Sequence, residues 1–314
     1  MLSIATAAAP QAAARCQMTN VAEIPVETGR GQLLAQGTID GHAVQVLVDT
    51  GTDVSLIWQP AIERLGLHLV NIPRARLYGL GGESYLYGAF VKEFRAGQFT
   101  AENRRFRVSE QLSGTMDVIL GEDLLSRGSL EFDLRHNVIR TMELTGCAPA
   151  QLPYWTKAYS MADLVASPRH ALAIRLDVLL NGHKVRAQID SGSSISIVSK
   201  SIADVAGIHY DSVSGSRLIG IGHGSLETWL GDVRTFTLGD ETIKNTQLRV
   251  AQLGKYRTTT RLGSRIAEAV AGQPEMLLGL DFLRAHHVII DNDTHKVVFT
   301  YEGGPIFEAG EPRK

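Results

Sequence analysis

One stretch of this chain occurs twice, and this duplication constrains the fold more than any other feature of the sequence. IDGHAVQVLVDTGTDVSLI, which contains Asp49, aligns without a gap with LNGHKVRAQIDSGSSISIV, which contains Asp190. The same spacing of 141 residues relates the glycine turn at 79–81 to the turn at 220–222. A repeat of this period in a chain of 314 residues predicts two related domains rather than one large core.

A third pair of motifs follows at a longer spacing. ILGEDLL, with Gly121, matches LLGLDFL, with Gly279, and these glycines lie 158 residues apart. The second copy has therefore gained 17 residues, which we place within 251–275. Its portion RIAEAVAG is expected to form a short helix that ends at Gly272. The basic residues of this insertion could bind a partner or a membrane surface, but a solvated surface excursion is the favoured interpretation.

Local signals within each copy indicate mainly β structure. The dipeptides Asp-Gly at 40–41 and Asn-Gly at 181–182 each lie between two apolar, β-prone runs, which is the strongest short-range signal for a hairpin. Short helices are expected at 59–66 and 199–207, each stopped by a glycine, and again at the third pair of motifs. The sequence thus predicts two similar, largely β lobes with a few helical turns.

The expected boundaries follow from the repeats. They are an N-terminal tail or export-signal remnant over 1–30, a first lobe over 31–144, a connection over 145–170, a second lobe over 171–302 and a C-terminal tail over 303–314. The first residues are rich in alanine, as at the cleavage end of a secretory signal, but they include neither a basic region nor a long apolar run.

The two cysteines lie on either side of the first lobe. A bridge between Cys16 and Cys147 would join the ends of that lobe and imply an oxidising compartment, whereas two separate thiols would suit a reducing cytoplasm. Together with the alanine-rich start, the pair favours the periplasm or secretion over the cytoplasm.

Composition and motifs exclude several classes of function. The net charge of −2 does not indicate a basic surface of the kind that binds nucleic acid. No apolar run approaches the roughly 20 residues that span a bilayer. No G-x-S-x-G elbow indicates a serine hydrolase, and no histidine spacing indicates zinc, so neither a metal nor a cofactor is expected. The histidines are expected at turns or on the surface, among them His42, His183, His223, His286 and His287.

The two Asp-containing triplets suit acid–base chemistry. Two carboxyl groups in an apolar setting share one proton, because like charges in contact cannot both form. The ionised member can then deprotonate a water molecule while the protonated member hydrogen-bonds a carbonyl oxygen. Ordinary turns would also use these residues, but the repeated context favours a dyad of Asp49 and Asp190. Asp123 and Asp281, at the starts of the later helices, are interpreted as structural carboxylates.

The ordered motifs resemble those of the retropepsin-like and pepsin-like aspartic proteases, over about 31–141 and 171–300. The closest likeness is to a retroviral-type dimer fused into one chain. The resemblance implies an all-β fold of two retropepsin-like β-barrel lobes with short helices, the active site at the lobe interface, and a monomer. It assigns catalysis to Asp49 and Asp190. Residues that support this dyad would be Thr50, Gly51, Thr52, Ser191, Gly192 and Ser193. Flap tips that bind substrate would be Gly79, Leu80, Gly81, Gly82, Gly220, Ile221, Gly222 and His223.

The resulting expectation is an aspartic endopeptidase that cleaves an extended protein or peptide segment without a cofactor. The hydroxyls of Thr52 and Ser193 are expected to lower the pKa values of the dyad and to give an acidic optimum. Glu122 and Leu280 stand where retroviral enzymes place an arginine. The rival is a silent peptide- or partner-binding module on the same fold, which the retention of both aspartates disfavours. A third possibility is a zymogen whose N-terminal tail or 251–275 segment covers the cleft.

Overall fold

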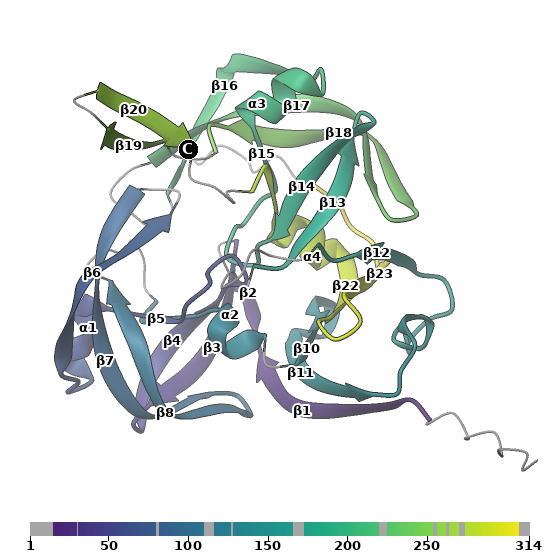
Figure 1. Cartoon of the computed structure of the whole chain (residues 1–314). Helices are drawn as coiled ribbons and strands as arrows, with labels where there is room; N and C mark the ends of the chain where they lie inside the picture. Colours follow the sequence, from purple (N-terminus) through teal and green to yellow (C-terminus); the bar gives the residue numbers. More distant parts are fainter. Residues whose placement is uncertain are drawn as a thin grey trace, which may run out of the picture.

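The computed structural model of the chain is almost entirely β (Figure 1). The α-helices in the described part of the chain are short: α1 (Gln59–Arg64), α2 (Glu122–Leu125), α3 (Lys200–Val205) and α4 (Leu280–Ala285). The residues that the structure describes are 15–29, 31–79, 82–109, 116–126, 128–165, 173–219, 225–253, 256–261, 264–269 and 274–307. Among them, no helix has the length and apolar character needed to cross a membrane.

The first repeat forms a closed barrel of six strands. The ring runs β3-β4-β9-β5-β8-β7 and closes because β3 also pairs with β7. A short β2 and a long β6 extend it at the edges. The strands are β2 (Glu27–Gly29), β3 (Gln32–Ile39), β4 (His42–Val48), β5 (Leu56–Trp58), β6 (Leu69–Gly79), β7 (Gly82–Ala96), β8 (Phe99–Ser109) and β9 (Val118–Leu120).

The second repeat forms a barrel with the same connectivity. Its ring runs β13-β14-β21-β15-β18-β17 and closes through a β13–β17 pairing, with β16 at the edge in the position of β6. The two lobes therefore confirm the all-β, duplicated fold. The strands are β13 (Arg175–Leu180), β14 (His183–Ile189), β15 (Ile197–Ser199), β16 (His209–Ile219), β17 (Ser225–Leu238), β18 (Glu241–Ala251) and β21 (Met276–Leu278).

A third sheet joins the lobes. Its order is β1-β11-β10-β22-β23-β12, and the antiparallel pairing of β10 with β22 sets Phe132 opposite Val288 at the centre. Both side chains belong to an apolar core that is continuous through the two barrels, so burial couples the lobes. The strands are β1 (Gln17–Pro25), β10 (Ser129–Asp133), β11 (Val138–Thr145), β12 (Ser160–Asp163), β22 (His286–Asp291) and β23 (Lys296–Tyr301).

The outer strands of this shared sheet correct the expected tails and connection. Gln17–Pro25, placed in the N-terminal tail, is β1 and pairs with β11, burying Ile24. Ser160–Asp163, placed in the connection, is β12 and pairs with β23. The C-terminal tail is shorter than expected, because Phe307 is buried against Phe236 with ring centroids 4.8 Å apart. Pairing with strands remote in sequence forms these elements, and no local periodicity reveals it.

Two further expectations were wrong. The segment RIAEAVAG was expected as a helix, but Ser264–Ala269 is strand β20, paired with β19 (Tyr256–Arg261). The preceding YRTTTR is rich in β-branched threonine and supplies the partner strand, which outweighs the helix propensity of the alanines. Gly272 lies outside the described residues. His286 and His287, expected at a turn or on the surface, are buried in β22.

Cys16 and Cys147 form a disulfide, which confirms the bridged alternative. It ties the chain just before β1 to the segment just after β11, and so links the two ends of the first lobe. Because the bridge closes a long loop, it restricts the unfolded chain strongly.

Replacing both cysteines by serine is expected to lower the free energy of unfolding by about 2–4 kcal/mol, because the unfolded chain regains the freedom that the bridge removes. Urea denaturation of the oxidised wild type and of the Cys16→Ser/Cys147→Ser variant measures the difference. A reducing agent should destabilise the wild type and leave the variant unchanged. Equal midpoints for the oxidised wild type and the variant would show that the bridge contributes nothing.

Candidate active site

The two triplets meet between the barrels, at the ends of equivalent strands. Strand β4 leads into Asp49 and strand β14 into Asp190. Each aspartate donates its backbone N–H to the third-motif strand of its own lobe, Asp49 to the Leu120 carbonyl (3.0 Å) and Asp190 to the Leu278 carbonyl (2.9 Å). Both aspartates are buried, with 6% and 9% of their surface exposed, so the fold holds two carboxyl groups away from bulk water.

Hydroxyl groups next to the aspartates brace the two lobes against each other. The Thr50 N–H donates to Ser191 Oγ and the Ser191 N–H donates to Thr50 Oγ1, each at 3.0 Å. The Thr50 hydroxyl in turn donates to the Ile189 carbonyl (3.0 Å), and the Ser191 hydroxyl to the Val48 carbonyl (2.9 Å). These hydrogen bonds form a reciprocal pair across the two lobes.

The glycines of the triplets let each loop approach the opposite carboxyl group. A Cβ atom built on Gly51 would fall well inside 3.0 Å of the Asp190 carboxylate oxygens, and one built on Gly192 equally close to the Asp49 carboxylate. Only a residue without a side chain fits at either position. This close approach is what brings the two carboxyl groups to hydrogen-bonding contact with each other.

The hydroxyls that follow the glycines differ between the lobes. Thr52 Oγ1 donates to Asp49 Oδ2 at 2.8 Å, as expected. Ser193 Oγ instead donates to the Ile195 carbonyl at 2.8 Å, so the expected bond to Asp190 is wrong. A hydroxyl has one proton to donate, and the backbone carbonyl receives it here. The Ser193 backbone N–H does reach Asp190 Oδ1, at 3.0 Å.

The pKa values of both carboxyl groups are raised, which corrects the expected lowering. Burial raises the pKa of Asp49, and the bonds from Thr52 and Gly51 oppose it without overcoming it. Burial and the adjacent charge of Asp49 raise the pKa of Asp190 well above its ordinary value. The pair therefore titrates as one unit, whose two carboxyl groups can share one proton.

Matched serine–aspartate networks hold each triplet loop to the following helix. Asp123 Oδ1 accepts hydrogen bonds from the Ser55 N–H (2.8 Å) and hydroxyl (2.7 Å). Asp281 accepts the same pair of bonds from Ser196, at 2.8 and 2.6 Å. Both carboxylates are structural, as interpreted from the sequence, but their main partner is a serine of the triplet loop. Burial raises the pKa of Asp281 to about 6.

Two polar residues at the site were missed or left unassigned by sequence reasoning. Gln188 Nε2 donates to the Gly51 carbonyl at 3.2 Å and so contacts the loop of the other lobe. The equivalent residue in the first repeat is Leu47. A glutamine in place of a leucine, at a strand position expected to be buried, was the sequence signal that could have identified Gln188. Glu122 is fully buried, and among the described residues its carboxylate oxygens have no hydrogen-bond partner. Burial raises the pKa of Glu122 well above its ordinary value, and the neighbouring charge of Asp49 acts in the same direction.

A long hairpin follows the triplet in each lobe. Strands β6 and β7 pair until Gly79 lies opposite Gly82, and β16 and β17 pair until Ile219 lies opposite Ser225. The backbone of Gly79 and Gly82 thus closes the described part of the first hairpin, where a flap tip was expected. The other expected tip residues lie outside the described residues: Leu80, Gly81, Gly220, Ile221, Gly222 and His223.

Comparison with protein families gives one match, and it occurs twice. Residues 35–124 and 176–282 both match the family described as Aspartyl protease. Each matched region begins in the first strand of a barrel, contains one triplet and ends in the helix after the third motif. The two regions together cover more than half of the chain. A search of curated proteins found no match.

Proposed function

The chain belongs to the aspartyl protease family, and on this basis we propose that it is an aspartic endopeptidase in which Asp49 and Asp190 together activate a water molecule. The observation that carries this proposal is the mutual contact of two buried carboxyl groups from different lobes, held by reciprocal hydrogen bonds. A family fold alone would not assign chemistry, because function depends on the site.

The different environments of the two carboxyl groups support distinct roles. Asp49, whose Oδ2 accepts a hydrogen bond from the Thr52 hydroxyl that favours its ionised form, acts as the base and takes a proton from the water molecule as the water oxygen bonds to the scissile carbonyl carbon. Asp190, protonated, donates its proton to the carbonyl oxygen, which gives a neutral tetrahedral diol. Asp49 then returns its proton to the amide nitrogen while the C–N bond breaks. One diol hydroxyl gives its proton to Asp190, and the starting protonation state is restored.

The proposed substrate is a protein or peptide segment in extended conformation. Each lobe offers a long two-stranded hairpin after its triplet, β6–β7 and β16–β17, and an extended segment can pair with such edges while its side chains enter pockets. One chain supplies both triplets, so a monomer is sufficient. The disulfide supports an oxidising compartment, and we propose the periplasm or the cell exterior.

Incubation of the purified, oxidised chain with a mixed peptide library tests the proposal. Cleavage within peptides, detected by mass spectrometry as paired fragments, is the expected result. Peptides retained by the protein on a size-exclusion column without any cleavage, across pH 3 to about 8, would favour a binding module instead. The range spans the ordinary carboxyl and histidine titrations.

Replacing Thr52 by valine is expected to move the acidic limb of the pH–rate profile to higher pH. Activity requires Asp49 ionised and Asp190 protonated, so the rate rises with pH through the pKa of the first and falls through the pKa of the second. The Thr52 hydroxyl lowers the pKa of Asp49; without it, Asp49 holds its proton to higher pH. The readout is kcat/KM against pH.

Ser193→Ala is the matched control, because the Ser193 hydroxyl donates to the Ile195 carbonyl and not to Asp190. Its basic limb should coincide with that of the wild type. Equal displacement of a limb by both substitutions would contradict the asymmetry between the lobes.

A further inference from the structure

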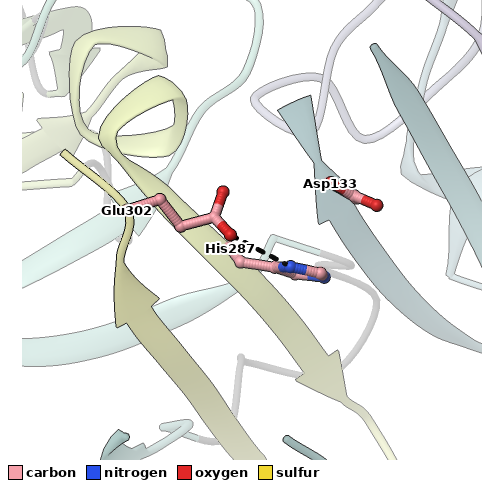
Figure 2. A group of neighbouring side chains, drawn as sticks. All are labelled: Asp133, His287 and Glu302. Atoms are coloured by element: carbon pink, nitrogen blue, oxygen red, sulfur yellow. Dashed lines mark ion pairs between the residues drawn. The ribbon is translucent and has the colours of Figure 1, made fainter. Parts of the chain in front are cut away.

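A second group of buried ionisable residues lies in the shared sheet, away from the dyad. Its centre is His287 of β22, a side chain only 5% exposed. Nε2 of this ring lies 2.7 Å from Glu131 Oε1 of β10, and Nδ1 faces Glu302 Oε1 at 3.6 Å. Asp133, at the end of β10 in the first lobe, completes the group (Figure 2). One atom each from Asp133, His287 and Glu302 lie within 4.8 Å of one another, and we call these three residues the junction cluster.

The imidazole of His287 is fixed in orientation from two sides. Trp155 stacks on it with ring centroids 3.6 Å apart and planes 4° from parallel. Glu131, the partner of Nε2, is itself held by the Tyr154 hydroxyl (2.6 Å) and by Arg140 Nη1 (3.1 Å). A carboxylate accepts hydrogen bonds, so Nε2 donates to Glu131, and in the neutral imidazole Nδ1 then presents its lone pair.

This arrangement points the Nδ1 lone pair at a carboxylate oxygen of Glu302. The separation of 3.6 Å exceeds a hydrogen bond. It is close to the roughly 3.4 Å between two ligand atoms on a tetrahedral ion with bonds of about 2.0–2.2 Å. With a neutral imidazole, Nδ1 and Glu302 Oε1 are two acceptors that face each other, and a cation between them would satisfy both.

Asp133 supplies a third ligand atom and has its own outer support. Its Oδ2 accepts a hydrogen bond from Arg140 Nη1 at 3.1 Å, and its Oδ1 lies 2.7 Å from Nδ1 of the exposed His136. A carboxylate oxygen has a second lone pair, so these bonds leave room for an ion. Carboxylates and histidines that bind metals are held by outer hydrogen bonds in this way, with the far nitrogen of the histidine donating to a carboxylate, as His287 does to Glu131.

The balance of charge around the junction cluster also favours a cation. Asp133, Glu131 and Glu302 bring three carboxyl groups to this junction, and the Arg140 guanidinium pairs with the first two of them and with Glu23. A divalent cation would balance the excess of negative charge.

We propose that Asp133, His287 and Glu302 bind one Zn²⁺ ion, which joins the first lobe to the second. A set of one imidazole nitrogen and two carboxylate oxygens suits zinc, whereas Mg²⁺ and Ca²⁺ take oxygen ligands. Asp133 belongs to the first lobe and the other two ligands to the second, so the ion would act on the stability of the lobe junction and not on the dyad.

Equilibrium titration of the full-length, tag-free, oxidised chain tests this site. After treatment with a chelator and its removal, Zn²⁺ is added in a calorimeter, and Co²⁺ is added separately while the visible absorption is recorded. One equivalent of Zn²⁺ with a micromolar or lower Kd is expected, together with Co²⁺ bands and a higher melting temperature. Glu302→Gln should weaken binding at least tenfold; this residue directly follows the end of β23 and is partly exposed, and near-UV circular dichroism verifies the fold of the variant.

Glu241→Gln is the matched control. Glu241 Oε1 faces the neighbouring buried histidine, His286, but at a direct hydrogen-bonding distance of 3.0 Å. This variant should bind Zn²⁺ with the affinity of the wild type. Asp190→Asn should do the same, because it would lose affinity only if the ion were bound at the dyad. Failure of the wild type to take up one equivalent, or equal affinity in Glu302→Gln and wild type, overturns the proposal. Asp133→Asn provides a second test should Glu302→Gln misfold.

Discussion

Asp49→Asn and Asp190→Asn are each expected to lower kcat for peptide cleavage by about 10²–10⁴-fold, the range associated with loss of a positioned acid or base. An asparagine at position 49 cannot take the proton from water, and one at position 190 has no acidic proton to give. Because the two groups share one proton, the double variant should be little worse than either single variant. Single-turnover cleavage of a peptide identified from the library measures the loss.

The same substitutions make a second prediction, for stability. Since burial raises the pKa of Asp190, the native state holds a proton that the unfolded chain releases at a lower pH. The contribution to stability is therefore complete below about pH 4 and is lost as the pH rises through the raised pKa. Asp190→Asn should show a smaller fall in the free energy of unfolding over that interval. Asp163→Asn, on the exposed strand β12, should match the wild type in both kcat and stability.

Full activity in Asp190→Asn would refute the dyad. Loss of activity with a lowered melting temperature would be ambiguous, so the stability measurement accompanies each rate. Replacement of one of two carboxyl groups in contact by an amide removes a buried ionisable group, and the folded variant is expected to be at least as stable as the wild type at neutral pH.

The duplication allowed much of this fold to be predicted from the sequence. The spacing of 141 residues that aligns Asp49 with Asp190 also pairs Thr50 with Ser191, and these residues do exchange hydrogen bonds across the lobes. Local rules located α1 and α3, although not the segment RIAEAVAG, and the Ser199 hydroxyl caps α3 by accepting a hydrogen bond from the Ile202 N–H. Repeated motifs and helix caps depend on residues that are close together in the sequence, so a single sequence is enough to predict them.

Features that depend on remote neighbours could not be predicted in this way. Strand β12 forms because it pairs with β23. His287 is buried because Glu131 and Trp155, which lie far from it in the sequence, contact its ring. Thr52 and Ser193 differ because the Thr52 hydroxyl donates to a carboxylate and the Ser193 hydroxyl to a backbone carbonyl. The sequence around each residue is compatible with either acceptor. The direction of the pKa shifts of Asp49 and Asp190 could not be predicted for the same reason. The sequence shows a hydroxyl beside each carboxyl group, but it does not show how deeply that carboxyl group is buried.

Gly192→Ala is expected to reduce kcat/KM by about 10²-fold or more, although no ionisable group changes. The added methyl group would overlap the Asp49 carboxylate, so the loops of the two lobes must separate by a few tenths of an ångström to about 1 Å, and a misplacement of that size costs about this much in rate. Overpacking should also lower the free energy of unfolding by about 1–3 kcal/mol. In Gly51→Ala the added methyl group would overlap the Asp190 carboxylate, so the same losses of kcat/KM and stability are expected.

The matched control is Gly29→Ala in β2, where an added methyl group has nothing within 4 Å. It should change neither activity nor stability by more than a few tenths of a kcal/mol. Because the methyl group at position 192 drives the two carboxyl groups apart, their shared proton is also less tightly held, and the separation between the acidic and basic limbs of the pH–rate profile should narrow. A Gly192→Ala variant with the rate and the pH–rate profile of the wild type would mean that the carboxyl groups need not touch for cleavage, and the role of the glycine would then be limited to folding.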